Sequence, residues 1–331
     1  MTTTLAFFSN KVGVGKTTLV YHLAHMFADL GRRVLLVDLD PQCKLTEMCL
    51  SEDSLLAVWQ EAHAGAGTSF GCLHPLMFES GDVRTPQLIE VSSGVQLLPG
   101  HLGLSTFDDP LADAWSGALG GGDSAFRRLS AFHRLALSAR RAEEEPELVL
   151  IDTGPTLSPI NRAAVLAADF IVTPLSPDVT SIQGLKNLGT VLHSWRKGWQ
   201  ERVARNAALI PLPPGRLLPL GYVAMQTRMR RSQQMGGIDY RGSSIAEAYA
   251  STWFGQAAAS TDGGADPSCL GVMRHYHTLM PLALDAQRPM FHLRPADGAI
   301  GSRMDYVRTC AADIRTLARS FLDKIDAPAP A

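Results

Sequence analysis

Short apolar runs alternate with longer amphipathic runs along this chain. The short runs are typical of strands buried on both faces and lie at 5–8, 33–37, 88–91, 95–98, 148–151, 170–174 and 220–225. Apolar residues at helical spacing occupy the intervals, at 19–30, 44–50, 54–62, 125–141, 159–168, 182–195, 243–254 and 304–325. Strands that alternate with helices predict an α/β fold with a doubly wound, mostly parallel sheet.

Several stretches between these elements show neither the pattern of a buried strand nor the spacing of an amphipathic helix. A glycine-rich break comes after residue 62, residues 99–123 predict loop mixed with short helix, and prolines interrupt residues 197–219. The sequence contains no internal repeat. It therefore predicts a single domain over residues 1–331, with insertions at about 53–145 and 197–275 rather than a second core.

The segment between the first predicted strand and the first predicted helix has the chemistry of a phosphate-binding loop. Gly13 and Gly15 let backbone N–H groups close around an anionic oxygen, beside the positive end of the helix dipole. Lys16 is placed to reach the β- and γ-phosphates of a nucleotide, and the Thr17 hydroxyl is a ligand for Mg²⁺. The alternative is a glycine turn that binds nothing, which the flanking strand and helix disfavour.

This loop departs from the ordinary pattern at its first glycine. Asn10 stands at that position and Lys11 follows it, so the match is to a variant loop that carries a further lysine. Thr18 occupies the place of the third glycine in a dinucleotide-binding fingerprint, which excludes that fingerprint.

Three aspartates come at or just after the ends of predicted strands. Asp38 and Asp40 follow the strand at 33–37, and Asp152 follows the strand at 148–151. Ligands of open α/β sheets bind at the carboxyl ends of the strands, so these carboxylates are expected near the phosphate loop. Helix capping or a surface pair is the alternative interpretation of such residues.

Charge and cysteine content narrow the class of protein. Thirty basic and 32 acidic residues give a net charge of −2, so no global field indicates a nucleic-acid or membrane partner. The five cysteines form no C-x-x-C pair, which argues against a disulfide framework and against a zinc or iron–sulfur site. The residues before the first predicted strand lack a basic region and a long apolar segment, and nowhere do eighteen uncharged apolar residues run together. We expect a soluble, uncleaved protein of the cytoplasm.

Three motifs together resemble the ParA/MinD group of P-loop ATPases: residues 11–18, residues 36–42 and residues 148–152. The likeness is closest to the ParA side, because Asp40-Pro41-Gln42 follows the second strand and residues 95–104 look like that family's strand and turn. It covers roughly the first 175 residues. The resemblance implies a parallel sheet with helices on both faces, binding of ATP and Mg²⁺, an ATP-dependent sandwich homodimer and slow hydrolysis.

The resemblance also implies roles for single residues. Lys11 is the signature lysine that reaches the partner subunit's phosphates, much as an arginine finger does; a solvated loop lysine is the alternative. Lys16 and Thr17 hold phosphate and Mg²⁺, and Asp40 orients the attacking water. Asp38 and Asp152 hold Mg²⁺ through its waters. The ATP-binding residues are then Lys11, Val12, Gly13, Val14, Gly15, Lys16, Thr17 and Thr18, with Met225 and Gln226 as candidates near the adenine.

The chain departs from the family pattern at two positions. Val12 stands where the family has glycine, and Gly154-Pro155 replaces the two prolines that commonly follow Asp152. A β-branched side chain beside the partner's phosphates is expected to hinder dimerisation without blocking ATP.

Three functions are compatible with the sequence. The first is a DNA-associated partitioning or positioning ATPase, stimulated by a partner protein and associated with the nucleoid. Its support is the cluster Arg228, Arg230 and Arg231, for which a solvated loop is the alternative. The second is a MinD-like membrane-cycling switch, disfavoured because residues 323–331 lack a basic amphipathic helix. The third is a metabolic or metal-delivery ATPase of the same fold, ranked last because cysteine ligands are lacking.

Overall fold

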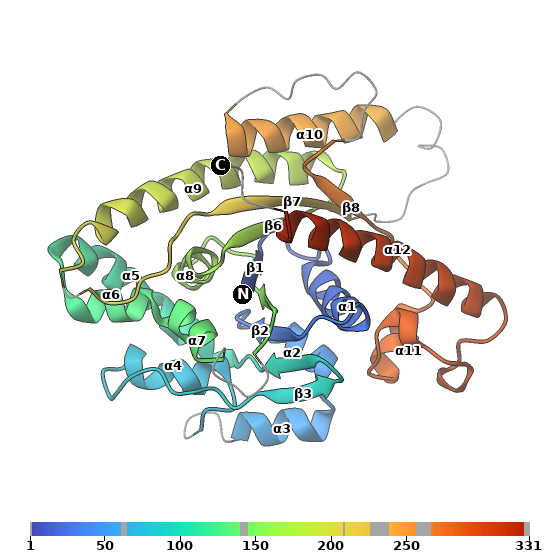
Figure 1. The fold of residues 1–331 in the computed structure, drawn as a ribbon, viewed down its shortest axis with the longest axis horizontal. Coiled ribbons are helices and arrows are strands. Elements are labelled where there is room, and N and C mark those ends of the chain that lie inside the picture. Colours follow the sequence, from blue (N-terminus) through green and yellow to red (C-terminus); the bar gives the residue numbers. More distant parts are fainter. Residues whose placement is uncertain are drawn as a thin grey trace.

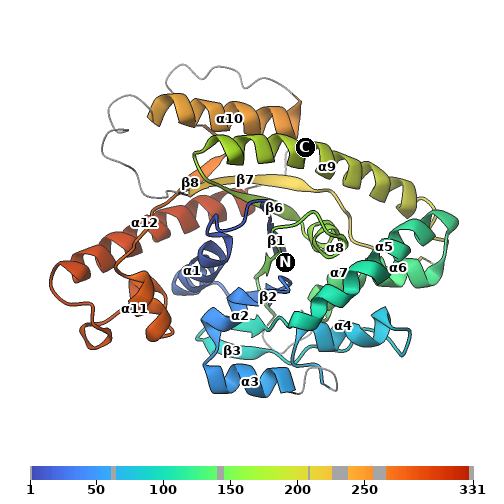
Figure 2. The same cartoon turned by 180° about the vertical axis from the view of Figure 1, so that it is seen from behind.

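One twisted sheet forms the middle of the molecule, with helices on both faces (Figures 1 and 2). The computed structural model describes residues 2–60, 65–139, 145–207, 209–225, 238–255 and 266–327. In these residues the strands are β1 (Thr3–Phe7), β2 (Val34–Asp38), β3 (Ile89–Ser92), β4 (Val95–Leu98), β5 (Leu148–Asp152), β6 (Phe170–Leu175), β7 (Leu218–Met225) and β8 (Cys269–Met273).

The strand order is β3-β4-β2-β5-β1-β6-β7-β8, and every neighbouring pair is parallel except β3 with β4. The predicted doubly wound, mostly parallel sheet is confirmed. Both predicted insertions contribute to this sheet, since β3 and β4 lie within 53–145 and β7 and β8 within 197–275. The division into a frame and insertions stays a prediction.

The longer helices in the described residues are α1 (Lys16–Asp29), α3 (Glu52–Gln60), α4 (Ser69–Met77), α5 (Asp108–Gly117), α7 (Ala131–Ala139), α8 (Pro159–Ala167), α9 (Val179–Val203), α10 (Ile238–Phe254) and α12 (Ser302–Ile325). Shorter ones are α2 (Lys44–Cys49), α6 (Asp123–Leu129), α11 (Met280–Asp285), η1 (Leu102–Phe107), η2 (Ala118–Gly120), η4 (Met290–His292) and η5 (Pro295–Asp297).

Each face of the sheet packs against its own set of helices. Alternate residues of β1 point in opposite directions, as the period of a strand requires. Leu5 and Phe7 join the apolar core beneath α1 and α12, whereas Ala6 and Phe8 join the core beneath α4 to α9. The alternation of short strands with amphipathic helices therefore produces a three-layer domain with a core on each side of the sheet.

The structure departs from the helical predictions in several places. The single helix predicted over 125–141 is broken at Ser130, whose hydroxyl donates to the carbonyl of Arg127 at 3.1 Å and so competes with the helical hydrogen bonds. The helix predicted to end at residue 195 continues to Val203, because Trp199 is fully buried on the same face. Helices α4 and α11 were not predicted.

Strand β8 was also not predicted from the pattern. It carries Gly271 at its centre and has a single β-branched residue, Val272, so its composition does not mark it as a strand. Within the described part of the chain, no helix is long and apolar enough to cross a membrane.

Candidate functional site

The loop from β1 into α1 lies at the carboxyl edge of the sheet. Gly13 and Gly15 have φ of 72° and 93°, the left-handed region that glycine adopts without strain. A Cβ on Gly15 would lie 2.9 Å from Cε of Met225, so the loop closely approaches the end of β7. In the described residues, α1 begins at Lys16 with neither a capping side chain nor an acidic residue in its first turn. Its N-terminal N–H groups are therefore available to an anion.

A buried ion pair lies directly beneath this loop. The Lys16 ammonium contacts Oδ1 of Asp152, and the Thr17 hydroxyl donates to Oδ2 of the same carboxylate at 2.7 Å. Lys16 is 7% exposed and Asp152 is fully buried. Parallel pairing of β1 with β5 sets Phe7 opposite Asp152, which places the carboxylate at the root of the loop. The two sequence motifs thus meet as one polar cluster.

Asp38 lies beside Asp152 in the β2–β5 register, and its side chain is turned toward α2. Its Oδ2 accepts from the Thr46 backbone N–H at 3.0 Å and from the Thr46 hydroxyl at 2.6 Å, while Oδ1 accepts from the Asp40 N–H at 3.1 Å. Burial, and then the nearby Asp152 carboxylate, raise the pKa of Asp38 well above its ordinary value. The structure therefore shows Asp38 holding the β2–α2 turn. Its predicted contact with Mg²⁺ through water stays a prediction.

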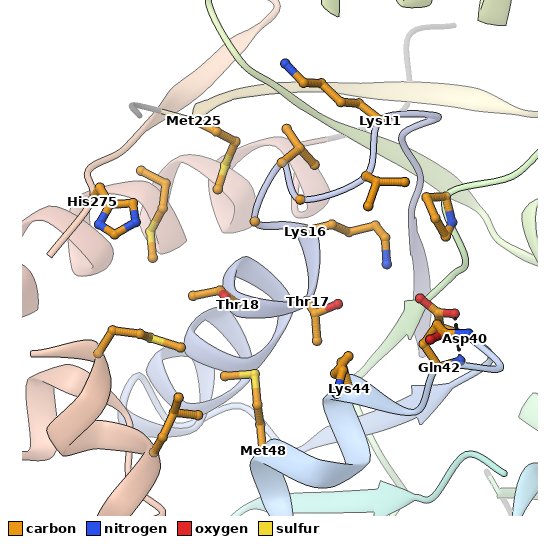
Figure 3. A pocket seen from close by; sticks show the side chains of 18 of the residues that line it. Lys11, Lys16, Thr17, Thr18, Asp40, Gln42, Lys44, Met48, Met225 and His275 are labelled. Carbon is orange, nitrogen blue, oxygen red and sulfur yellow. Dashed lines mark hydrogen bonds between the residues drawn. The ribbon is translucent and has the colours of Figure 1, made fainter. Parts of the chain in front are cut away.

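Asp40 faces the space in front of Lys16 (Figure 3). Its Oδ1 accepts from the Gln42 backbone N–H at 3.0 Å, which fixes the carboxylate. Burial is the main cause that raises the pKa of Asp40, and the Gln42 hydrogen bond and the Lys16 charge oppose the shift. A Cβ on Gly154 would lie 3.5 Å from Oδ1 of Asp40, so the loop after β5 passes close to the same carboxylate.

The loop after β5 explains one departure from the family pattern. The Gly154 N–H donates to Oδ1 of Asn161 at 2.9 Å, and the Asn161 amide donates back to the Gly154 carbonyl at 3.1 Å. A proline at position 154 would lack the first of these hydrogen bonds. Glycine here is therefore matched to Asn161 on α8.

Lys11 points away from Lys16 in this structure (Figure 3). Its ammonium pairs with Oδ2 of Asp178 at 2.5 Å and donates to the Ser181 hydroxyl at 3.1 Å. Asp178 also caps α9, because its Oδ1 accepts from the Ser181 N–H at 2.9 Å. Val12, the next residue of the loop, is 77% exposed. The sequence patterns did not single out Asp178 or Ser181.

A cavity of about 860 Å³ opens between the phosphate loop and the layer formed by β8, α11 and η4. All the loop residues from Lys11 to Thr18 line it, together with Asp40 and Met225, whereas Asp38 and Asp152 lie behind the lining. The β8, α11 and η4 side contributes apolar side chains that the sequence patterns did not single out, namely Met273, Met280, Leu284 and Met290. Arg274, His275 and Tyr276 also line the cavity there. The binding and catalytic roles predicted for the lining residues stay predictions.

Several predicted residues are not described by the structure. Gln226 lies outside the described residues, as do the three arginines of the predicted DNA contact, Arg228, Arg230 and Arg231.

The donor set at the loop fits a magnesium ion. The Thr17 hydroxyl and the Asp152 carboxylate are hard oxygen ligands that already lie together, and Mg²⁺ in such sites takes few protein ligands beside phosphates and waters. Among the described residues no group of three or more histidine, cysteine or acidic side chains forms a metal site of its own. Thr17 and Asp152 would hold the ion.

A glycine loop at the carboxyl edge of a parallel sheet, a buried lysine beneath it and an adjacent hydroxyl–carboxylate pair define a P-loop nucleotide-binding protein. Comparison with known proteins agrees with this class. A family profile described as an AAA domain matches residues 2–204. The chain is 30% identical over 224 residues to the chromosome-partitioning ATPase Soj of Thermus thermophilus, covering 68% of this chain and 75% of that protein. The chain therefore belongs to the ParA-like family of P-loop ATPases.

Other relatives share less of their length or less sequence. The virulence plasmid ParA family protein pGP5-D of Chlamydia psittaci is 29% identical over 186 residues, 56% of this chain and 61% of that protein. The crystal structure of protein DIP2308 from Corynebacterium diphtheriae has a TM-score of 0.73 at 26% identity and covers 98% of both chains. A putative plasmid partition protein from Borrelia burgdorferi B31, bound to AMPPNP, shares the fold with a TM-score of 0.56 at 16% identity, over 98% of this chain and 100% of that one.

Proposed function

We propose that this protein binds Mg-ATP in the cavity, hydrolyses it slowly and dimerises on ATP as a DNA-associated partitioning or positioning switch. The observation that carries the proposal is the cluster of Lys16, Thr17 and Asp152 beneath the phosphate loop, with Asp40 facing the same cavity. The relation to Soj, a chromosome-partitioning ATPase, supports the cellular role.

In this proposal the buried ion pair is a resting arrangement. Lys16 neutralises Asp152 while no phosphate is bound, and it turns to the phosphates of ATP when they occupy the loop. A bound Mg²⁺ supplies positive charge that offsets the charge of the phosphates. Thr17 and Asp152 would hold the ion, and its charge would offset that of Asp152 once Lys16 has turned to the phosphates.

Asp40 orients the attacking water and accepts its proton. Burial raises the pKa of this carboxyl, which brings the group closer to the pH at which it works and makes it a better base. The Gln42 N–H holds one oxygen, which leaves the other to contact water.

The position of Lys11 supports the proposal that hydrolysis is slow. Its ammonium is held by Asp178 and Ser181 and points away from Lys16, so in this proposal a second cation comes from a partner subunit to offset the charge on the transferred phosphate. A stimulating partner protein would act by favouring that arrangement.

The test is a measurement of particle mass by analytical ultracentrifugation with ADP, with ATP and with a slowly hydrolysed ATP analogue. Each sample is run with and without nonspecific duplex DNA. We expect monomers with ADP, dimers with ATP and the analogue, and DNA retained only by the dimer, with steep salt dependence. Retention on anionic vesicles instead of DNA would favour a membrane-cycling switch, and ATP turnover without dimers or DNA would favour a metabolic enzyme.

Lys16→Ala tests whether the phosphate loop binds ATP. The variant removes the cation that meets the phosphates and leaves Asp152 buried without its partner, so we expect ATP binding to be lost in calorimetry. Lys44→Ala, which removes a largely exposed lysine from the same cavity, is expected to weaken binding by less than about threefold. Equal affinity in Lys16→Ala and the unmodified protein would overturn the assignment of the loop.

A further inference from the structure

A buried histidine joins the phosphate-loop helix α1 to η4, and both elements contribute to the lining of the cavity. His22 lies on α1 and is fully buried. Its Nδ1 lies 2.7 Å from the carbonyl oxygen of Thr18, and its Nε2 accepts a hydrogen bond from the Met290 backbone N–H at 3.1 Å. Thr18 of α1 and Met290 of η4 both line the cavity. One imidazole, itself outside the lining, therefore links a lining residue of α1 to a lining residue of η4.

The two partners fix the protonation of this ring. The Met290 N–H only donates, so Nε2 must carry a lone pair, and the Thr18 carbonyl only accepts, so Nδ1 must carry the proton. Burial lowers the pKa of His22 to about 4, and the Thr18 hydrogen bond only partly offsets this. The imidazole is neutral near pH 7, and both hydrogen bonds persist there.

Packing holds the same ring in place. Tyr21 and Phe291 contact it edge-on, with centroid distances of 5.2 and 6.0 Å. A second link joins η4 to α1, in which His292 Nε2 lies 2.8 Å from Oδ2 of Asp29, but both side chains of that pair are partly exposed. Water competes for the exposed pair and not for the buried one, so the His22 bridge is the more rigid of the two.

The cavity has two ends of different chemistry. The loop end offers the Lys16 ammonium, the Thr17 hydroxyl and backbone N–H groups, which suit a triphosphate. The end formed by α11 and η4 offers apolar side chains, including Met280 and Met290, which suit a flat aromatic base. With the triphosphate on the loop, the base is left to contact the wall that His22 holds.

We propose that His22 is a positioning residue for the base of the bound nucleotide. By tying the Met290 N–H to the Thr18 carbonyl, it sets the spacing between the apolar wall and the phosphate loop. His22 touches neither end of the ligand and acts through Met290. The inference rests on the proposed function, since it requires a nucleotide in this cavity.

The test compares two ligands that share the phosphates and differ in the base. Calorimetry gives the affinity for ATP and for inorganic tripolyphosphate, each with Mg²⁺, in the unmodified protein and in His22→Phe. Phenylalanine keeps the packing against Tyr21 and Phe291 and removes both hydrogen bonds. We expect ATP affinity to fall by about tenfold while tripolyphosphate affinity changes by less than about twofold.

Two further variants separate positioning from general stability. His22→Gln retains an acceptor for the Met290 N–H and is expected to recover most of the ATP affinity; it also keeps the test decisive if His22→Phe does not fold. His25→Phe is the matched control, because His25 is 4% exposed on the same helix but contacts the Ser92 hydroxyl of β3 at 3.1 Å, away from the cavity. It should leave the ratio of the two affinities unchanged.

The outcomes are distinct. An equal loss for both ligands in His22→Phe, or no loss for either, would overturn the positioning role while ATP binding by the unmodified protein still stands. A change in the affinity ratio in His25→Phe of the same size would also overturn it. If the unmodified protein binds neither ligand, the proposed function fails first and this inference falls with it.

Discussion

The two lysines of the phosphate loop are held in contrasting ways. Lys16 lies in a buried pair with Asp152, where losing one partner leaves a charge that water cannot reach. Lys11 pairs with Asp178 where the two side chains are 31% and 40% exposed, so the attraction is weakened by solvent. The first arrangement keeps the Lys16 charge buried directly beneath the loop, and the second lets Lys11 leave its partner when a stronger anion is offered.

Asp178→Asn tests whether this pair restrains Lys11. Asparagine is also a good N-cap, so the bond to the Ser181 N–H and the start of α9 should be retained while the charge is removed. We expect ATP-dependent dimerisation to strengthen by about twofold to fivefold, the range of a partly exposed ion pair. Sedimentation with the slowly hydrolysed analogue gives the dimer affinity.

The control for that variant is Asp82→Asn, which breaks another partly exposed pair, with Arg134, on a different part of the chain. Its dimer affinity should equal that of the unmodified protein. If the dimer affinity of Asp178→Asn also equals that of the unmodified protein, the ion pair does not restrain Lys11 measurably.

Asp40 is predicted to act in turnover and not in binding. Its carboxylate faces the cavity but is held by the Gln42 N–H, so Asp40→Asn keeps this bond and loses only the base. The group acts on the water in the transition state. We therefore expect the ATP affinity of Asp40→Asn to lie within about twofold of that of the unmodified protein, and its turnover number to be lower by about a hundredfold. Phosphate release at saturating ATP measures the rate. An unchanged turnover number would move the role to another carboxylate.

At the scale of elements, α1 carries two buried histidines on the face that packs against η4 and β3. His22 is bonded at both nitrogens, whereas Nε2 of His25 has no hydrogen-bond partner among the described residues. Burial, with smaller contributions from His22 and His292, lowers the pKa of His25 to about 3. The folded protein therefore keeps His25 neutral at a pH where the unfolded chain would protonate it.

This difference predicts an acid-dependent loss of stability. A histidine whose pKa is lower in the folded state binds fewer protons there, so the free energy of unfolding falls as pH drops below the unfolded pKa of about 6.5. Between pH 7 and pH 5 the loss from His25 should be about 2 kcal/mol. Over that interval the free energy of unfolding of His25→Phe should fall by about 2 kcal/mol less than that of the unmodified protein. Urea titrations at each pH measure both values. Parallel curves for the two proteins would contradict the assigned protonation state.

Comparing the variant with the unmodified protein isolates this histidine from opposing groups. Asp38 and Asp40 have raised pKa values, so their contribution to stability increases as pH falls, the opposite sign to that of His25. Both aspartates are present in each protein of the comparison, and their contributions cancel.

The elements also show what the sequence can and cannot predict. The phosphate loop, Asp40 and Met225 were predicted from local motifs and from the family likeness, because each belongs to a strand–loop unit whose pattern is contained in a few residues, and all of them line the cavity. Met273, Met280 and Met290 were missed. They come from β8, α11 and η4, short elements without periodicity, and only the packing of α12 and η4 against α1 brings them to the loop.

At the scale of the whole molecule, the strand order sets which loops share one surface. Strands β5, β1 and β6 are neighbours, so the loops that follow them leave the same edge of the sheet. Each carries an exposed apolar side chain just beyond the strand: Leu157 after β5, Val12 after β1 and Val179 after β6. In the proposed dimer this edge, with the phosphate loop at its centre, faces the second subunit.

Val12→Gly tests how closely two such edges approach. Val12 does not have a positive φ, so its backbone does not require glycine, and the substitution changes mainly the bulk at the tip of the loop. Since the side chain is 77% exposed, no packing within the chain is lost. We expect dimerisation with the ATP analogue to strengthen, by about fivefold or more if the two loops meet closely, while ATP affinity stays within about twofold. Sedimentation and calorimetry give the two values. The dimer affinity of Val12→Ala should lie between those of the unmodified protein and Val12→Gly. If the unmodified protein already dimerises tightly and Val12→Gly is no better, the two subunits accommodate the valine.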